Sequence, residues 1–190
     1  PQSETVWRQA DKYKVPRLAF VNKMDRQGAD FPRVISMMKE RLKTRPVPVN
    51  IPWGKEDNFV GVIDLVAGKA IRWTDDTLGA DFVVEEVPAE CRNDCEHYRE
   101  VLLEAASEQS DEVLHKYLHG EEIEEQSIKE AVRKAAISMK ITPVFCGTAF
   151  KNKGIQPLLD GVIDYLPSPL DIPPVDRKST RLNSSHVSQS

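Results

Sequence analysis

The spacing of apolar residues along the first 46 positions predicts a helix, a strand and a second helix. The first helix is expected at residues 3–14, and a short buried strand follows at 17–21. A second amphipathic helix is expected after Asp30, whose side chain is suited to cap it. The apolar face of the first helix would contain Val6, Ala10 and Tyr13. A helix–strand–helix order is typical of a parallel α/β sheet.

Residues 47–87 show a different pattern, in which short β-branched segments are separated by Gly, Asn and Asp. Strands of an antiparallel meander are therefore expected at 47–51, 59–65, 70–74 and 81–87. Helical spacing then predicts helices at 89–109, 111–119 and 125–139. An apolar strand at 142–146 and an amphipathic helix at 155–166 return to the first pattern.

This return indicates one α/β domain interrupted by an inserted α+β subdomain. We expect residues 1–46 to form the first core segment, 47–140 the insert, and 141–175 the second core segment and the start of a linker. The serine-rich stretch 176–190 has no apolar periodicity and resembles a translated sequencing adapter, so we expect a non-native tail. Because the chain does not begin with Met, an internal fragment is expected.

Composition narrows the class of protein. The chain has 190 residues, of which 40% are hydrophobic, and its apolar runs are far shorter than a membrane span of about 20 residues. A cytoplasmic protein without membrane contact is therefore expected. The net charge of −4 argues against a general or sequence-specific nucleic-acid surface. Three cysteines are too few and too scattered for a disulfide framework, and no metal site is expected from them.

The segment Asn22-Lys23-Met24-Asp25 directly follows the first predicted strand, where parallel sheets place ligand-binding loops. A carboxylate at Asp25 is suited to accept two parallel hydrogen bonds from the ring N–H and amino group of guanine. Adenine lacks that pair of donors and would leave the carboxylate unpaired, at a cost of several kcal/mol. Asn22 is expected to tie the loop to its neighbours, and the Lys23 stem to cover the base. The alternative is that these residues only form a turn.

A second polar loop follows the strand predicted at 142–146. Gly147, Thr148 and Ala149 are small and would let backbone N–H groups approach a flat ligand closely. The N–H of Ala149 is suited to donate to the guanine carbonyl oxygen, which adenine replaces with an amino group. The two loops would then contact complementary edges of one base.

The sequence resembles the nucleotide-binding domain of bacterial-type elongation factor G, a translational GTPase, over residues 1–175. The similarity is carried by PQSETVWRQADKYKVPRLAFVNKMDRQGADF, by NIPWGKEDNFVGVIDLVAGKAIRW and by FCGTAFKNKGIQPLLDGVIDYLPSPLDIPP. It implies a partial P-loop-GTPase-type parallel sheet with an inserted α+β subdomain. It also implies GTP or GDP as ligand, the ribosome as partner, and a role in ribosomal translocation during protein synthesis.

The resemblance also implies roles for single residues. The guanine-specificity loop would contain Asn22, Lys23 and Asp25, with Met24 as spacer, and the second base-binding loop Thr148 and Ala149, where the family commonly has Ser-Ala. Two alternatives stay open: a tetracycline-resistance ribosomal protection GTPase, and an interaction module that binds no nucleotide.

Two GTPase motifs are missing or displaced. No Gly-x-x-x-x-Gly-Lys-Ser/Thr occurs in the 190 residues, so neither the phosphate loop nor its magnesium ligand is present. Residues 76–79 match Asp-x-x-Gly, but they follow the Asn-Lys-x-Asp motif instead of preceding it. We therefore expect magnesium only in the intact protein. The chain alone is not expected to hydrolyse GTP.

The predicted insert is strongly acidic, with seventeen Asp or Glu against three Lys or Arg between residues 75 and 125. A stripe spaced by four residues contains Glu96, Glu100, Glu104 and Glu108. A solvated face is one interpretation, and the resemblance implies contact with the ribosomal stalk protein as another. His115 and His119 have the spacing of a metal-binding pair but no third ligand close in sequence, so a surface role is expected.

Overall fold

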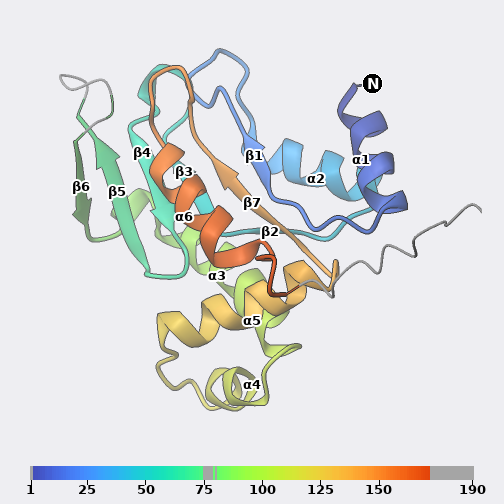
Figure 1. Ribbon diagram of the computed structural model, residues 1–190. Coiled ribbons are helices and arrows are strands. Elements are labelled where there is room, and N and C mark those ends of the chain that lie inside the picture. Colours follow the sequence, from blue (N-terminus) through green and yellow to red (C-terminus); the bar gives the residue numbers. More distant parts are fainter. Residues whose placement is uncertain (1, 75–78, 80, 172–190) are drawn as a thin grey trace, which may run out of the picture.

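The computed structural model describes residues 2–74, 79 and 81–171, arranged around two β-sheets (Figure 1). The first sheet is parallel and three-stranded, in the order β1 (Ala19–Val21), β7 (Thr142–Cys146) and β2 (Pro46–Pro48). Every residue of the central strand β7 is buried, as its near-continuous apolar sequence requires. The tail 176–190 lies outside the described residues.

The second sheet is an antiparallel meander of β3 (Asn50–Trp53), β4 (Gly61–Asp64), β5 (Lys69–Trp73) and β6 (Phe82–Glu85). The single strand expected at 47–51 is wrong, because the chain changes sheets in the middle of it. Val49 is the crossing point: its N–H donates to Val144 (2.8 Å), and its carbonyl accepts the N–H of Leu65 (3.0 Å). The meander therefore begins at Asn50, and β2 belongs to the parallel sheet.

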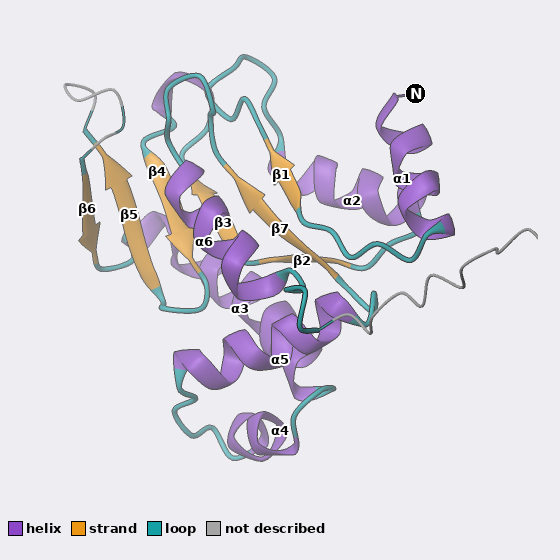
Figure 2. Ribbon diagram, in the orientation of Figure 1, coloured by secondary structure: helices purple, strands orange, loops and turns teal. Residues whose placement is uncertain are grey.

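Helices flank the two sheets (Figure 2). They are α1 (Gln2–Lys12), α2 (Phe31–Leu42), α3 (Arg92–Ser107), α4 (Asp111–Leu118), α5 (Glu125–Ile137) and α6 (Ile155–Tyr165), with short 3-10 turns at Glu56–Asn58 and Ala89–Cys91. The expected cap of α2 is confirmed, since the Asp30 carboxylate accepts the N–H of Arg33 at 3.0 Å. The mixed α/β fold class is likewise confirmed.

Helix α1 lies at the edge of the molecule beside α2 and buries none of its residues (Figure 1). The apolar residues expected on one face of this helix are open to solvent, since Val6 is 64% exposed and Tyr13, which lies just beyond the end of the helix, is 69% exposed. Trp7 makes the main contact, with the Arg17 guanidinium 4.2 Å from its ring centroid. Arg17 also donates to the Trp7 carbonyl (3.0 Å) and pairs with the Asp11 carboxylate, so contacts with Arg17 hold the helix instead of a buried stripe.

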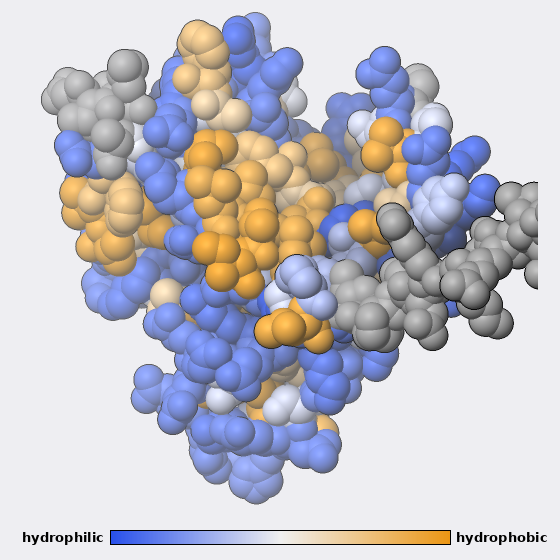
Figure 3. Space-filling view, viewed as in Figure 1, coloured by the Kyte–Doolittle hydropathy of each residue, from blue (hydrophilic) through white to orange (hydrophobic). Residues whose placement is uncertain are grey.

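Apolar side chains also gather on one outer face, over α6 (Figure 3). Leu159, Val162 and Ile163 of this helix are exposed, although its other face packs against β7 and α5. Within the described part of the chain, no helix is long and apolar enough to cross a membrane. Cys91, Cys95 and Cys146 are buried, and their thiols are free.

Candidate functional site

The two polar loops lie side by side at the carboxyl edge of the parallel sheet. Their strands, β1 and β7, are neighbours, and Val21 is the register partner of Cys146. Backbone hydrogen bonds continue past the strand ends, from Gly147 N–H to the Val21 carbonyl (3.1 Å) and from Met24 N–H to the Gly147 carbonyl (3.1 Å). The structure therefore brings the two predicted loops together at the edge where α/β proteins bind ligands.

Asn22 joins the two loops through its side chain. Its Oδ1 accepts hydrogen bonds from the N–H of Lys23 (2.8 Å) and from the N–H of Ala149 (3.0 Å). The tying role expected of Asn22 is thus visible in the contacts. The N–H of Ala149, expected to face a guanine carbonyl, is instead directed at Asn22. A base contact through this N–H requires Asn22 to share it or release it.

Asp25 is held as an anion within this loop pair. Its side chain is only 10% exposed, and burial by itself raises its pKa. A hydrogen bond from the Thr148 side chain and the Lys151 ammonium, 3.2 Å from Oδ2, outweigh that effect, so the pKa lies below its ordinary value of 3.8. A deprotonated carboxylate is the state that guanine recognition requires, because only that state offers two acceptors.

Lys151 was not expected from the sequence. Its side chain is half exposed and pairs with Asp25 across the two loops. The only sequence signal was a cation two residues beyond Ala149, and such a signal is too common to identify a partner. Thr148, by contrast, is almost fully buried, so its side chain lies in the interior of the loop and not on the open surface.

Lys23 and Met24 give the first loop its shape. Lys23 has a φ of 64°, a left-handed backbone conformation that is uncommon for a residue with a side chain. The turn exposes Lys23 and directs Met24 inward, where only 2% of it is accessible. Met24 is therefore a core residue that anchors the loop. Its position in the motif had implied only a spacer.

The second loop is a tight hairpin closed by paired bonds between Thr148 and Lys153 (2.9 and 3.1 Å). Gly147 is required there, because a Cβ on it would lie 2.3 Å from the Lys153 carbonyl oxygen. Phe150 lies at the tip of the hairpin and is 95% exposed. Small residues thus form the end of the loop next to β7, as the sequence indicated, and an aromatic ring lies at the tip of the loop.

Glu56 fixes the first loop from the side of the antiparallel sheet. Its N–H donates to the Met24 carbonyl (2.9 Å), and its Oε1 accepts the N–H of Gly28 (2.7 Å). Glu56 has a φ of 55°, so the turn that presents both groups is itself strained. The residue holds both ends of the turn 24–28, and no motif or spacing in the sequence indicates this role.

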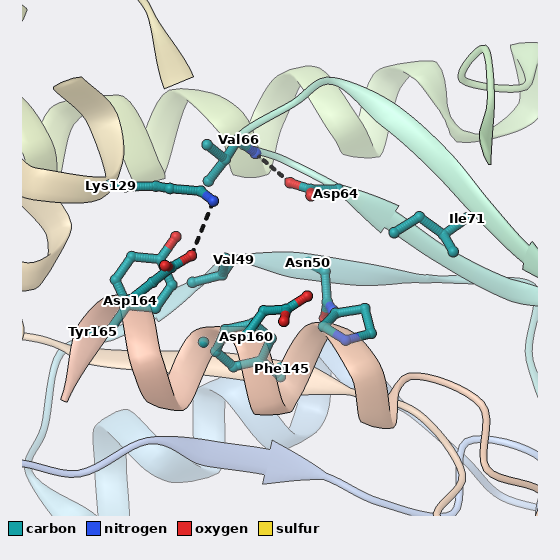
Figure 4. Close-up of a pocket in the computed structure, with 12 residues that line it drawn as sticks. Val49, Asn50, Asp64, Val66, Ile71, Lys129, Phe145, Asp160, Asp164 and Tyr165 are labelled. Carbon is teal, nitrogen blue, oxygen red and sulfur yellow. Dashed lines mark hydrogen bonds and ion pairs between the residues drawn. The ribbon is translucent and has the colours of Figure 1, made fainter. Parts of the chain in front are cut away.

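A separate cavity of about 100 Å³ lies at the junction of the two sheets, away from the polar loops (Figure 4). Asn50 spans this junction, and its Oδ1 accepts the buried N–H of Cys146 at 2.9 Å. Lys129 pairs with Asp164 at 2.9 Å on the opposite wall, and Asp64 lies nearby. The cavity lies at the seam between the two sheets, and none of the predicted base-contacting residues lines it.

The Asp-x-x-Gly match at 76–79 falls largely outside the described residues. Only Gly79 is described, and its carbonyl accepts a hydrogen bond from Gln156 Nε2 at 2.9 Å. A Cβ on Gly79 would lie 2.7 Å from the Asn152 carbonyl oxygen. Gly79 therefore packs against the end of the second loop and the start of α6.

A parallel sheet that carries these two loops at adjacent strand ends defines a GTPase-type α/β domain. Residues 1–168 match the family described as the Elongation factor Tu GTP binding domain, and the chain belongs to this family. A crystal structure of a protein from Thermus thermophilus is similar to it, with a TM-score of 0.75 and 30% sequence identity. That match covers 88% of this chain and 24% of the other, so the chain spans about a quarter of the length of that protein.

The residues at the sheet edge carry chemical groups of the kind that a guanine base requires. An ionised carboxylate at Asp25 is the acceptor that the base requires, and Gly147 allows the second loop to close tightly beside it. Asn22 keeps the two loops in contact. The family binds guanine nucleotides, and these residues provide groups suited to the base.

Proposed function

We propose that this chain is the guanine-recognising part of an elongation-factor-G-type translational GTPase, which couples GTP hydrolysis to ribosomal translocation. One observation carries the proposal: Asn22 and Ala149, on loops from adjacent parallel strands, are joined at 3.0 Å. This contact supports a single site built from both sequence motifs. The order of elements along the chain, in which the proposed insert follows β2 of the parallel sheet and precedes β7, supports the elongation factor G type in particular.

In this proposal Asp25 selects guanine. Its carboxylate accepts the ring N–H and the exocyclic amino group, and the cost of leaving it unpaired disfavours adenine. Lys151 forms an ion pair with the Asp25 carboxylate in the present structure. Binding of a guanine base therefore requires Lys151 to share this carboxylate or to move away from it. The Lys23 stem covers the base. The phosphates and magnesium are bound by segments outside this chain, so the chain alone does not hydrolyse GTP.

The experiment exchanges the base that the site prefers. The tested protein joins residues 1–175 to an upstream segment carrying a Gly-x-x-x-x-Gly-Lys-Ser/Thr loop. Asp25→Asn replaces one acceptor with a donor, so we expect GTP affinity to fall by about 10- to 100-fold. Affinity for xanthosine triphosphate should rise, because xanthine has a carbonyl in place of the guanine amino group.

The matched control is Asp57→Asn, an exposed carboxylate in the turn that follows β3. This variant should bind GTP and xanthosine triphosphate as the wild type does. Nucleotide affinities are measured by fluorescence titration. An Asp25→Asn protein that still prefers GTP would overturn the role of Asp25, and a wild type that binds no nucleotide would favour the interaction-module alternative.

We further propose that the acidic face of α3 contacts a basic segment of the ribosomal stalk protein. Glu96, Glu100 and Glu104 are all exposed along this helix. Glu108 differs from them, because its carboxylate accepts two 2.8 Å hydrogen bonds from the Arg45 guanidinium. Glu108 therefore belongs outside the contact surface.

Charge reversal tests this partner. Replacing Glu96, Glu100 and Glu104 with Lys in the intact factor should weaken stalk-protein binding and reduce stalk-stimulated GTPase activity, while intrinsic nucleotide affinity stays unchanged. Reversal of Glu121, Glu122 and Glu124, which lie beyond α4, provides the control for net charge. Equal losses from both triple variants would show a nonspecific charge effect and contradict a contact specific to α3.

A further inference from the structure

The C-terminal end of α4 carries two histidines one helical turn apart, far from the nucleotide loops. The rings of His115 and His119 are stacked, with centroids 4.2 Å apart and planes 24° from parallel. Both side chains are exposed. Histidines at this spacing present two nitrogen ligands on one face of a helix, which is the basis of many transition-metal sites.

The structure adds the third ligand that the sequence spacing did not reveal. Gly120 has a φ of 65° and ends the helix, with its N–H bonded to the Tyr117 carbonyl (3.2 Å). The next N–H, of Glu121, bonds to the Lys116 carbonyl (2.9 Å). These two bonds form a Schellman motif, which turns the chain back over the last helical turn. One nitrogen of each histidine and one Glu121 oxygen consequently lie within 4.8 Å of one another.

The hydrogen bonds around the cluster leave its ligand atoms available. The Nδ1 of His119 lies 2.8 Å from the His115 carbonyl oxygen, which can only accept, so Nδ1 carries the proton. In the neutral ring, Nε2 then holds the lone pair that a metal requires. Lys116, which follows His115 in the sequence, is paired with Glu112 at 2.9 Å. No ion pair of Glu121 occurs within residues 2–74, 79 and 81–171.

We propose that His115, His119 and Glu121 form a binding site for a divalent transition-metal ion such as Zn²⁺. Two imidazoles and a carboxylate suit Zn²⁺, whereas Mg²⁺ and Ca²⁺ prefer sites made only of oxygen ligands. Metal–ligand bonds of about 2.0–2.2 Å require the two stacked rings to rotate so that their nitrogens converge, and exposure of all three residues permits this rotation. Further carboxylates at Glu122, Glu124 and Glu125 add negative charge nearby.

The proposal is tested by titrating the 190-residue chain with ZnCl₂ in a calorimeter, up to about 100 µM free zinc. We expect one zinc ion per chain. His115→Ala and His119→Ala should each weaken binding by about tenfold or more, and Glu121→Gln should weaken it by a smaller factor. Zinc should also raise the melting temperature of the wild type but not of the double histidine variant.

The controls separate this site from other zinc ligands. His97→Ala removes a histidine of α3 outside the cluster, and Glu122→Gln removes the carboxylate next to Glu121, so neither should change zinc affinity. Circular dichroism confirms that each variant is folded. No zinc binding by the wild type overturns the proposal. Unchanged binding by His115→Ala and His119→Ala, or equal loss in His97→Ala, overturns it as well.

Discussion

The side-chain oxygen of Asn22 accepts a hydrogen bond from the backbone N–H of Ala149, a residue 127 positions further along the chain. The same oxygen accepts the N–H of Lys23. One side chain therefore fixes the conformation of the first loop and ties it to the second. Because both loops follow strands of one sheet, this contact determines how far apart their base-binding groups lie.

Asn22→Ala should release the second loop without unfolding the sheet. The N–H of Ala149 loses its acceptor, and the loss of a hydrogen bond worth about 1 kcal/mol corresponds to roughly fivefold faster amide exchange at that position. Hydrogen exchange measured by NMR tests this. Asn22→Asp is the control, since it keeps an acceptor oxygen and should retain most of the protection. Equal acceleration in both variants would contradict the bridging role.

Lys151→Ala should raise the pKa of Asp25 toward its ordinary value, because the ion pair and one hydrogen bond are lost. The folded-state pKa of Asp25 is lowered, so this group stabilises the fold above pH 3.8 and loses that effect as the pH falls through the folded-state pKa. The variant should lose part of this stabilisation at neutral pH. Carboxyl NMR titration gives the pKa, with Lys39→Ala of α2 as an exposed control. An unchanged Asp25 titration in Lys151→Ala would contradict the pairing.

Glu56→Ala should loosen the turn 24–28 by removing the acceptor of the Gly28 N–H. We expect a loss of about 1 kcal/mol in the free energy of unfolding, measured with urea. Glu56→Gln keeps an acceptor oxygen on a side chain of the same length and should remain close to the wild type. If the two variants are equally destabilised, the carboxylate contact is not what holds the turn.

Local patterns are sufficient to predict the positions of the two loops, because both directly follow buried strands. The strand predicted at 142–146 has the bounds observed for Thr142–Cys146, since five consecutive buried positions leave little freedom in a short apolar run. The contact between the loops follows from the expectation of a parallel sheet, in which the carboxyl ends of strands share one edge.

Contacts that depend on tertiary placement are not predictable in the same way. An apolar run at 47–51 fits either sheet equally well, and only the bonds of Val49 to Val144 and Leu65 show where the chain changes sheets. Lys151 and Glu56 are ordinary charged residues in sequence, and they gain their partners from folding. Helix α1 shows the same limit in another way. Helical spacing of apolar residues predicts the helix, but it does not predict whether another element covers its apolar face.

Asp64 occupies an unfavourable position for a charge at the seam between the sheets. Its Oδ1 accepts the N–H groups of Val66 (2.8 Å) and Ala67 (3.1 Å), which lower its pKa. Burial has the opposite and larger effect, so the pKa is raised above its ordinary value of 3.8. The folded state therefore binds this proton more tightly than the unfolded state does.

Asp64→Asn should consequently stabilise the protein at neutral pH relative to the wild type. Stability contributed by protonated Asp64 is present below pH 3.8 and is lost as the pH rises through the raised folded-state pKa, so the ionised group costs stability at neutral pH. The amide oxygen of Asn still accepts both backbone N–H groups. Urea unfolding at several pH values should show that the stability advantage of Asp64→Asn over the wild type grows with pH. Asp64→Ala removes the acceptor of both N–H groups. It should therefore be less stable than the wild type at a pH where the wild-type Asp64 is protonated. A constant difference between Asp64→Asn and the wild type across this range would show that burial of the charge is not the cause.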